Sequence, residues 1–405
     1  MPPSNNVNSF VKLFAVLLLA VITSATDLSV KSDIFAQTVY KYISQNGKNN
    51  VFSPLSLHAV MALAYQGSAG HTERILKVHF LSKAKTATGY LTLLWDLNRS
   101  KNVSMQIANK IYVRKDHQFK KKFEYIAKNN FQAEVESVVF RQKQIVANKI
   151  NNWVKQKTHN KIKNLLSPND LNGNVRSVIL NAIYFKGEWE SKFDKSKTRI
   201  QKFYLDNRRT VNCLMMHQHG SYFMGESRDL DATLLRLKFR NPRFSLIIVL
   251  PKTKTGITRL EARLPTTDIA ALTKGMWGKM AEVYLPRFKI ESKYEFKKAF
   301  EKMGLEEIYS NQANFSNIMA NENLKVSKIV QKATIEINEE GGEAAAATAL
   351  VTVLLSANYT LPLPAIFRAD HPFMYLLTFD LEQNTSPYAL PKDSVVLFMG
   401  KVAKP

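Results

Sequence analysis

Residues 339–356 of this chain read EEGGEAAAATALVTVLLS, an alanine run between two glycines and a β-branched tail. Alanine has the highest intrinsic helix propensity, so the run by itself would predict a helix. The glycines before it and the valines and threonines after it fit a helix poorly. Read as a strand, the segment places mostly small groups on one face, namely Gly342, Ala344, Ala346, Thr348, Leu350 and Thr352. Such a segment could slide between two strands that are already in place.

The composition of the whole chain is that of a globular protein with a strong positive charge. It has 405 residues, 45% of them hydrophobic and 22% charged, which excludes a wholly disordered chain because there is ample apolar surface to bury. A single cysteine excludes a disulfide framework and any cysteine-rich metal site. The net charge of +24 attracts polyanions such as nucleic acid, sulfated polysaccharide or acidic lipid.

The N-terminus predicts secretion. Leu13–Ile22 is an apolar run of signal-peptide length, followed by small residues at the spacing of a cleavage site, so cleavage is expected after Ala25. A buried helix or membrane anchor is the less favoured alternative, because the run is too short to span a bilayer. We therefore expect a signal peptide at 1–25 and a secreted mature chain, 26–405, without membrane or nucleic-acid partners. Its Asn-x-Ser/Thr sequons are candidate glycan acceptors at Asn98, Asn102, Asn314, Asn358 and Asn384.

Helical and strand-like segments do not alternate regularly. This pattern predicts a mixed α+β fold and disfavours a doubly wound sheet. Ser53-Pro54 is typical of a helix start, and Val146, Ile150 and Val154 repeat at helical spacing with lysines on the other face. The strand-like runs are Val178–Phe185, Phe244–Leu250, Ala281–Leu285, Ala333–Ile337, Met374–Phe379 and Val395–Met399.

Motifs of the common enzyme classes do not occur in the sequence. It contains no Gly-x-Ser-x-Gly, His-Glu-x-x-His, Walker loop or Gly-x-Gly-x-x-Gly. Cys213, His217 and His219 are close together but lack a fourth ligand, so a turn or strand is favoured over a metal site. Cys213 is instead expected to be buried and unreactive. The chain is therefore predicted not to be an enzyme and to need neither metal nor cofactor.

Several separated motifs resemble those of one family, the serpins, from about residue 29 to Val402. Asn50–Ser56 (NVFSPLS) resembles the start of the family's second helix, and Leu180–Trp189 (LNAIYFKGEW) resembles the strand under its loop-insertion site. The other matching motifs are Leu285–Lys289 with Met303–Leu305, Val326–Lys328 with Lys332-Ala333, the Glu339 segment, Asp370–Phe373 and Phe398–Val402. The sequence of Arg368–Phe373 is most similar to that of arthropod members of the family.

The resemblance implies a single monomeric domain with three β-sheets, eight or nine helices and an exposed reactive-centre loop at about 339–366. It also implies a suicide mechanism: a serine protease cleaves the loop, forms an acyl-enzyme and is trapped covalently when the loop inserts into the central sheet. The native state of such a protein is strained and long-lived, and insertion releases the strain. The hinge of this loop would be Glu339, Gly341, Gly342, Glu343, Ala344, Ala345, Ala346, Ala347 and Thr348.

Two positions depart from the family pattern. Gly342 stands where inhibitory members usually carry Thr or Ser; glycine inserts without a clash but weakens a strand by about 0.5–1 kcal/mol. Gln331 stands where the family often has a histidine, and a glutamine can bridge neighbouring polar groups but carries no charge near neutral pH. The resemblance places these residues at the centre and the top of the opening sheet: Ser53, Ser56, Asn181, Trp189, Gln331 and Arg287, the last in an exposed pair with Glu339.

Counting seventeen residues from the hinge glutamate, as in inhibitory members, puts the cleaved bond at Leu355–Ser356. A leucine fits the apolar pocket of chymotrypsin-like or elastase-like proteases, whereas trypsin-like enzymes are unfavoured. Leu354 and Asn358 remain alternatives, because the stretch that follows is longer than usual. A binding or carrier protein on the same fold, working without insertion, is the alternative function.

The positive charge is concentrated along the lysine-rich segment that carries the apolar stripe of Val146–Val154. A heparin-like glycosaminoglycan is the candidate partner there, and a solvated helix face is an equally weighted alternative. The family's best-known heparin helix would match Thr88–Leu97, which here has no Lys or Arg. The candidate polyanion-binding residues are Lys143, Lys149, Lys155, Lys157, Lys161 and Lys163.

Overall fold

The structure is a computed structural model that describes residues 26–115, 118–171, 174–319, 324–341, 363–382, 390 and 393–405. The α-helices in these ranges are 26–43, α2 (Pro54–Gly67), α3 (Gly70–Lys77), α4 (Lys83–Arg99), α5 (Lys121–Asn130), α6 (Lys143–Lys157), α7 (Ile257–Arg263), α8 (Ile269–Lys274) and α9 (Lys297–Lys302). Short 3-10 turns are η1 (Pro168–Asp170), η2 (Lys195–Lys197), η3 (Leu264–Thr266) and η4 (Glu306–Tyr309). Within the described ranges, every helix is too short or too polar to cross a membrane.

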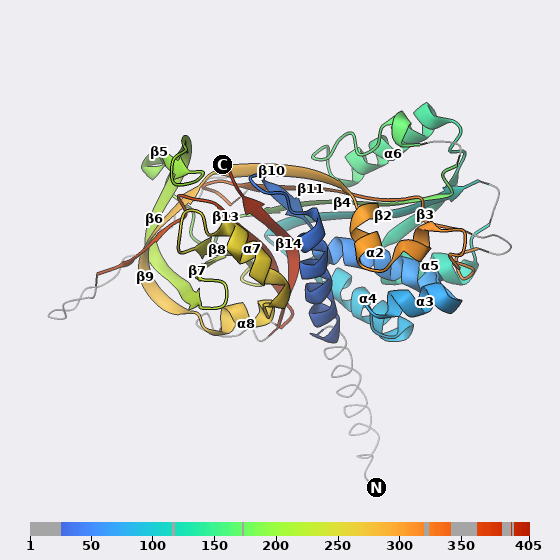
Figure 1. Cartoon of the computed structure of the whole chain (residues 1–405), viewed down its shortest axis with the longest axis horizontal. Helices are drawn as coiled ribbons and strands as arrows, with labels where there is room; N and C mark the ends of the chain where they lie inside the picture. Colours follow the sequence, from blue (N-terminus) through green and yellow to red (C-terminus); the bar gives the residue numbers. More distant parts are fainter. Residues whose placement is uncertain are drawn as a thin grey trace, which may run out of the picture.

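A five-stranded sheet crosses the molecule in the order β10-β11-β4-β2-β3 (Figure 1). Its central strands β11 and β4 are parallel and paired from Lys328↔Val178 to Thr334↔Tyr184. β10 and β2 run antiparallel to these two strands, and β3 runs parallel to β2. The strand bounds are β2 (Val103–Arg114), β3 (Ala133–Val138), β4 (Ser177–Gly187), β10 (Phe288–Glu295) and β11 (Lys328–Ile337).

A second strand system has the order β1-β14-β13-β8-β7-β6-β9-β12, with β5 attached to β6. The long strand β6 pairs with β9 along its middle and with β7 at its end. Two of the three sheets that the resemblance implies are therefore joined into one through β6. The bounds are β1 (Asn50–Phe52), β5 (Arg199–Tyr204), β6 (Thr210–Ser227), β7 (Ala232–Lys238), β8 (Phe244–Pro251), β9 (Trp277–Pro286), β12 (Ala365–Arg368), β13 (Phe373–Asp380) and β14 (Ser394–Val402).

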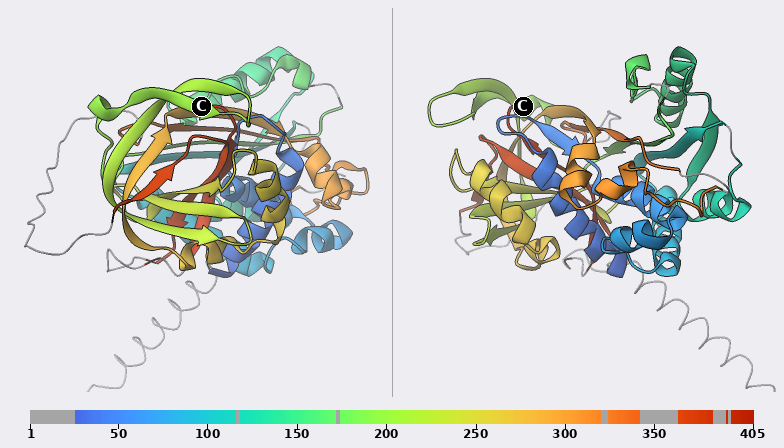
Figure 2. Two further views of the ribbon diagram at one scale, coloured as in Figure 1. Left: turned by 60° about the vertical axis from the view of Figure 1, so that its left-hand side comes forward. Right: turned by 45° about the vertical axis from the view of Figure 1, so that its right-hand side comes forward.

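Side-chain alternation along β4 separates two apolar layers. Ile179 and Ile183 belong to the large core that includes α2, whose residues are all buried. Val178 and Leu180 point to the opposite face, where they pack with the apolar side of α6. The views show α6 on one face of the five-stranded sheet and α2 to α5 on the other (Figures 1 and 2). The mixed α+β architecture predicted from the sequence is thus confirmed.

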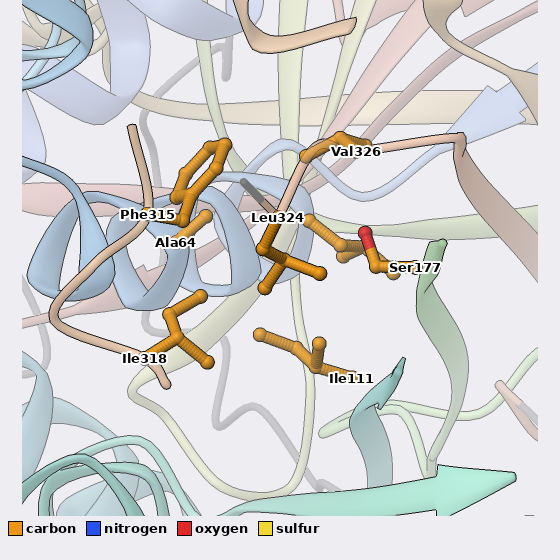
Figure 3. A pocket seen from close by; sticks show the side chains of 8 residues that line it. Ala64, Ile111, Ser177, Phe315, Ile318, Leu324 and Val326 are labelled. Carbon is orange, nitrogen blue, oxygen red and sulfur yellow. The ribbon is translucent and has the colours of Figure 1, made fainter. Parts of the chain in front are cut away.

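The predicted helix start at Ser53-Pro54 is also confirmed. The Ser53 side chain accepts a hydrogen bond from the backbone N–H of Ser56, and Pro54 occupies the first helical turn, where its missing N–H removes no helical bond. The far end of the same helix borders a small cavity of about 10 Å³ lined by Ala64, Phe315 and Ile318 among others (Figure 3). That volume is at the limit for a single water molecule, so this cavity is a packing defect and too small for a ligand.

Candidate functional site

The candidate site is the joint between the parallel strands β4 and β11. Their backbone pairing ends at Thr334↔Tyr184, although both strands continue further. Over the remaining residues, 335–337, β11 pairs with β10. The two central strands therefore separate at the end where the chain leaves β11 toward Gly341, which is the last described residue before 363.

The separated end is closed by the segment that follows β4. The backbone N–H of Trp189 donates to the carbonyl of Glu340 at 3.0 Å, and its indole Nε1 donates to the carbonyl of Asn338 at 2.8 Å. The N–H of Phe193 donates to the carbonyl of Glu339 at 2.9 Å. Gly341 has a φ of +95°, and a Cβ there would come within 2.5 Å of the Gly187 carbonyl, so only glycine fits. Three hydrogen bonds to backbone carbonyls thus hold the segment 338–341, which we call the exit of β11, against the end of β4.

Glu339 lies inside this closure. Its side chain is 3% exposed and accepts a hydrogen bond from Thr198 Oγ1 at 2.8 Å, while Arg287 Nε lies 3.4 Å from its other oxygen. The sequence predicted an exposed pair, which is wrong for the carboxylate, because it is buried and hydrogen-bonded to Thr198 while only Arg287 is exposed. The expected loop boundaries also shift, since Ala365 and Ile366 belong to β12, where they pair with β9.

A buried polar cluster spans the middle of the joint. Gln331 of β11 is 0% exposed, and its Oε1 accepts from the Ser53 N–H at 2.9 Å. Its Nε2 donates to the Ser53 carbonyl at 2.9 Å and to Asn181 Oδ1 at 2.6 Å. Asn181, the register partner of Gln331 on β4, donates to the Ser56 hydroxyl and to Asn109 Oδ1. Gln331 therefore joins both central strands to the start of α2, as a neutral group can.

Asn109 was missed by the sequence reasoning. It lies on β2 directly opposite Asn181 and is buried. A lone asparagine in a strand has no local signal for such a role. Only the register of β2 against β4 brings it into the cluster.

The lysine-rich face of α6 is less cationic than the sequence predicted. Five of the six candidate lysines are exposed and Lys161 is half-buried. Lys149 and Lys157, however, form ion pairs with Glu136 and Glu134 of β3. Burial alone would raise the pKa of Glu134, but its hydrogen bonds to Lys157, Lys110 and Trp153 outweigh this and lower the pKa to about 2. Two of the predicted cations are therefore neutralised by acids of the adjacent strand.

The remaining candidates fall into two groups. Asn98, Asn102 and Asn314 are exposed at the surface. The predicted bond Leu355–Ser356, the hinge residues from Gly342 to Thr348, and the sequons at Asn358 and Asn384 lie outside the described residues.

The cysteine and histidines of β6 do not form a metal centre. Cys213 is buried, and burial raises the pKa of its thiol to about 11, which is consistent with an unreactive cysteine. His217 and His219 both contact the carboxylate of Glu282. In the described part of the chain, no three or more His, Cys, Asp or Glu side chains converge on a common point where a metal ion could bind.

Comparison with known proteins assigns the family. The model of the serpin family, described as serine protease inhibitors, matches residues 31–405. Antichymotrypsin-2 from Bombyx mori is 36% identical over 86% of this chain and 94% of its own length. Antitrypsin from the same insect is 35% identical over 90% and 95%. Among solved structures, Serpin48, a highly specific serpin in the insect Tenebrio molitor, has a TM-score of 0.82 and 30% identity over 94% of this chain and 98% of that one.

The chain belongs to the serpin family, as the motif resemblance predicted. The insect relatives are named as inhibitors of proteases, and this agrees with the prediction that the chain is an inhibitor by family.

Proposed function

We propose that this protein is a secreted, irreversible inhibitor of chymotrypsin-like or elastase-like serine proteases. The protease cleaves the Leu355–Ser356 bond, and the segment before the bond then inserts between β4 and β11 while the protease stays covalently attached. The observation that carries this proposal is the pair of parallel central strands whose ladder stops short at the point where the loop begins.

The sheet geometry explains why insertion would be favourable. A segment that turns back after Gly341 would run antiparallel to both β11 and β4. One parallel pairing would be replaced by two antiparallel pairings, which are slightly more stable per residue. The segment would also add a full strand of backbone hydrogen bonds to the sheet. Apart from Glu343, the side chains from Gly342 to Ala349 are small, which suits a strand that must pass beneath α6 and above α2.

The class of protease that is inhibited depends on the loop more than on overall sequence similarity. The two Bombyx mori relatives differ by one percentage point in identity, yet their names refer to chymotrypsin in one case and trypsin in the other. Overall identity therefore does not separate the two specificities, and we assign the choice of target to the residue that enters the protease pocket. Leu355 is apolar, which favours a chymotrypsin-like or elastase-like pocket over a trypsin-like one.

The mature protein under this proposal is the single domain 26–405, released after removal of 1–25 and acting as a monomer. Exposure of the sequons at Asn98, Asn102 and Asn314 is compatible with glycans at these positions. The inhibitor needs no metal or cofactor, because the protease supplies the catalytic groups.

A gel experiment tests the proposal directly. The mature chain is incubated with chymotrypsin, and we expect an SDS-resistant complex together with a cleaved form whose mass places the cut after Leu355. Leu355→Arg should transfer complex formation from chymotrypsin to trypsin. A main cut after Leu354 or Asn358 would refute the bond assignment.

Insertion is tested separately. Ala346→Glu would bury an unpaired carboxylate in the inserted strand, at a cost of several kcal/mol. Cleavage should continue while the covalent complex is lost. If wild-type protein were cleaved without forming any complex, with several proteases of this class, a non-inhibitory binding or carrier protein would be the better interpretation.

A further inference from the structure

A second cavity lies where β6 leaves β7. The two strands are paired from Phe223↔Arg236 to Ser227↔Ala232, and upstream of Phe223 β6 pairs with β9. At the end of β7, Leu237 and Lys238 pair with β8 and no longer with β6, and the Lys238 carbonyl accepts a hydrogen bond from the N–H of Glu190 at 3.0 Å. The resulting fork holds a cavity of about 270 Å³, close to the lower size of small-molecule sites in proteins.

The walls of this cavity are aromatic. Trp189 and Phe193 line it from the segment that follows β4, and Tyr222 and Phe223 line it from β6. Flat apolar side chains on several sides are typical of sites for small aromatic or aliphatic molecules.

One end of the cavity is cationic. Arg236, which is 3% exposed, donates from Nε to Ser245 Oγ and from Nη2 to Asp380 Oδ2, but its Nη1 has no partner among the described residues. Lys238 also lines the cavity, and burial lowers the pKa of its ammonium although the nearby carboxylate of Glu190 acts in the opposite direction. A buried guanidinium N–H without an acceptor is unfavourable, and an anion can relieve it.

The charges around this end favour an anion. Three cations, Arg236, Lys238 and Arg243, act on the buried carboxylate of Asp380. Asp380 is not among the lining residues; the acid that lines the cavity is Glu190, which is exposed. Among the residues that line the cavity, the two cations Arg236 and Lys238 therefore outnumber the acid Glu190, and an anionic group can be placed against both cations.

The cavity shares a wall with the joint of the sheet. Trp189 and Phe193 line the cavity, and their backbone N–H groups hold the carbonyls of Glu340 and Glu339. A ligand packed against these rings would stabilise the segment in the position that closes the exit of β11.

We propose that this cavity binds a small amphipathic carboxylate, with its apolar body between the aromatic walls and its carboxylate toward Arg236 and Lys238. Binding holds the Trp189–Phe193 segment in place. Under the proposed inhibitory function, on which this consequence rests, the bound ligand also slows loop insertion.

Calorimetry on the unreacted mature chain tests the site independently of inhibition. The probe is naphthalene-2-carboxylate, and the neutral 2-naphthalenemethanol is its control. A charge-assisted hydrogen bond contributes about 1.5–3 kcal/mol, so the carboxylate should bind at least about tenfold more tightly than the alcohol. Equal binding of the two, or no binding of the carboxylate, would overturn the site.

Two variants and one control variant locate the binding. A Cβ added at Gly278, which lines the cavity, meets no atom within 4 Å, so Gly278→Leu should fold and obstruct the cavity. Gly275→Leu has equally open space outside the cavity and is the matched control. Lys238→Met should weaken carboxylate binding about tenfold and leave alcohol binding unchanged. Unchanged carboxylate binding by Gly278→Leu would place the probe elsewhere and refute the assignment.

The effect on the joint has its own readout. Hydrogen exchange at the amides of Trp189 and Phe193 should slow when the carboxylate is bound, because both donate to the exit of β11. Slower exchange with an unchanged rate of complex formation would reject the coupling to insertion. Absence of any protease complex would contradict the inhibitory function while leaving the ligand site supported.

Discussion

The buried cluster around Gln331 makes a quantitative prediction. Gln331→Leu keeps a side chain of similar size but removes the side-chain hydrogen bonds that join β11 to Ser53 and Asn181. The Ser53 carbonyl keeps a partner, because the N–H of Leu57 also donates to it at 3.1 Å. The Ser53 N–H and Asn181 Oδ1 lose the partner that the described structure gives them.

The size of the effect follows from these two groups. A buried polar group left without a partner costs about 1–3 kcal/mol, so the variant should lose about 2–6 kcal/mol of unfolding free energy. This is a large part of the 5–15 kcal/mol of net stability that is typical of proteins. The β4–β11 joint should open more easily as well, because Gln331 and Asn181 are register partners across it.

Guanidinium unfolding of the unreacted mature chain measures this loss. Thr334→Val is the matched control on the same strand, because the buried Thr334 hydroxyl has no partner among the described residues, so its removal should be neutral or stabilising. A free energy for Gln331→Leu within 1 kcal/mol of wild type would show that the cluster does not hold the joint. So would a Thr334→Val variant that is destabilised as much as Gln331→Leu.

Three further predictions concern charge. Burial lowers the pKa of His58 to about 3, although the hydrogen bond to the His79 carbonyl acts in the opposite direction. Below about pH 6.5 the unfolded state therefore binds more protons than the native state, and the unfolding free energy should fall from pH 6.5 toward pH 3; a profile unchanged in His58→Gln would contradict this. Glu339→Gln should destabilise the chain by about 1–3 kcal/mol in the same assay. Arg287→Gln should cost less, because Arg287 is 45% exposed and water can replace its partner; a larger loss for Arg287→Gln would contradict the burial of Glu339. If the lysines of α6 and of the segment after it bind a sulfated polyanion, Lys163→Gln should lower the salt needed for elution from heparin more than Lys157→Gln, whose ammonium is already paired with Glu134. Elution unmoved by both would support a merely solvated face.

Several features of the fold could be predicted because they depend on neighbours in the sequence. The start of α2 follows from a serine cap and a proline one residue later. The buried stripe of α6 follows from apolar residues at helical spacing, and the central strands follow from short runs of branched and aromatic residues. Cys213 was expected to be buried because an unpaired cysteine usually behaves as a small apolar residue.

The site was predicted in part, and only through motif resemblance. Gln331, Ser53 and Asn181 were expected to meet, but no local pattern relates Ser53 to a residue 278 positions later. The absence of a signal for Asn109 has the same cause, since it joins the cluster through the β2–β4 register. Local periodicity predicts which face of a strand is buried, whereas the partner on that face is set by how strands are ordered in the sheet.

The sequence by itself determined the mixed α+β class, the family motifs and the small-residue segment after Glu339, because each is written in residues that are adjacent or regularly spaced. Only the tertiary structure decided that Glu339 is buried, that Lys149 and Lys157 are neutralised by β3, and that an aromatic, cationic cavity lies beside the exit of β11. The physical reason is that burial, ion pairing and cavities are properties of surfaces brought together from distant segments. A charged residue carries no local mark of whether its partner will be water or another strand.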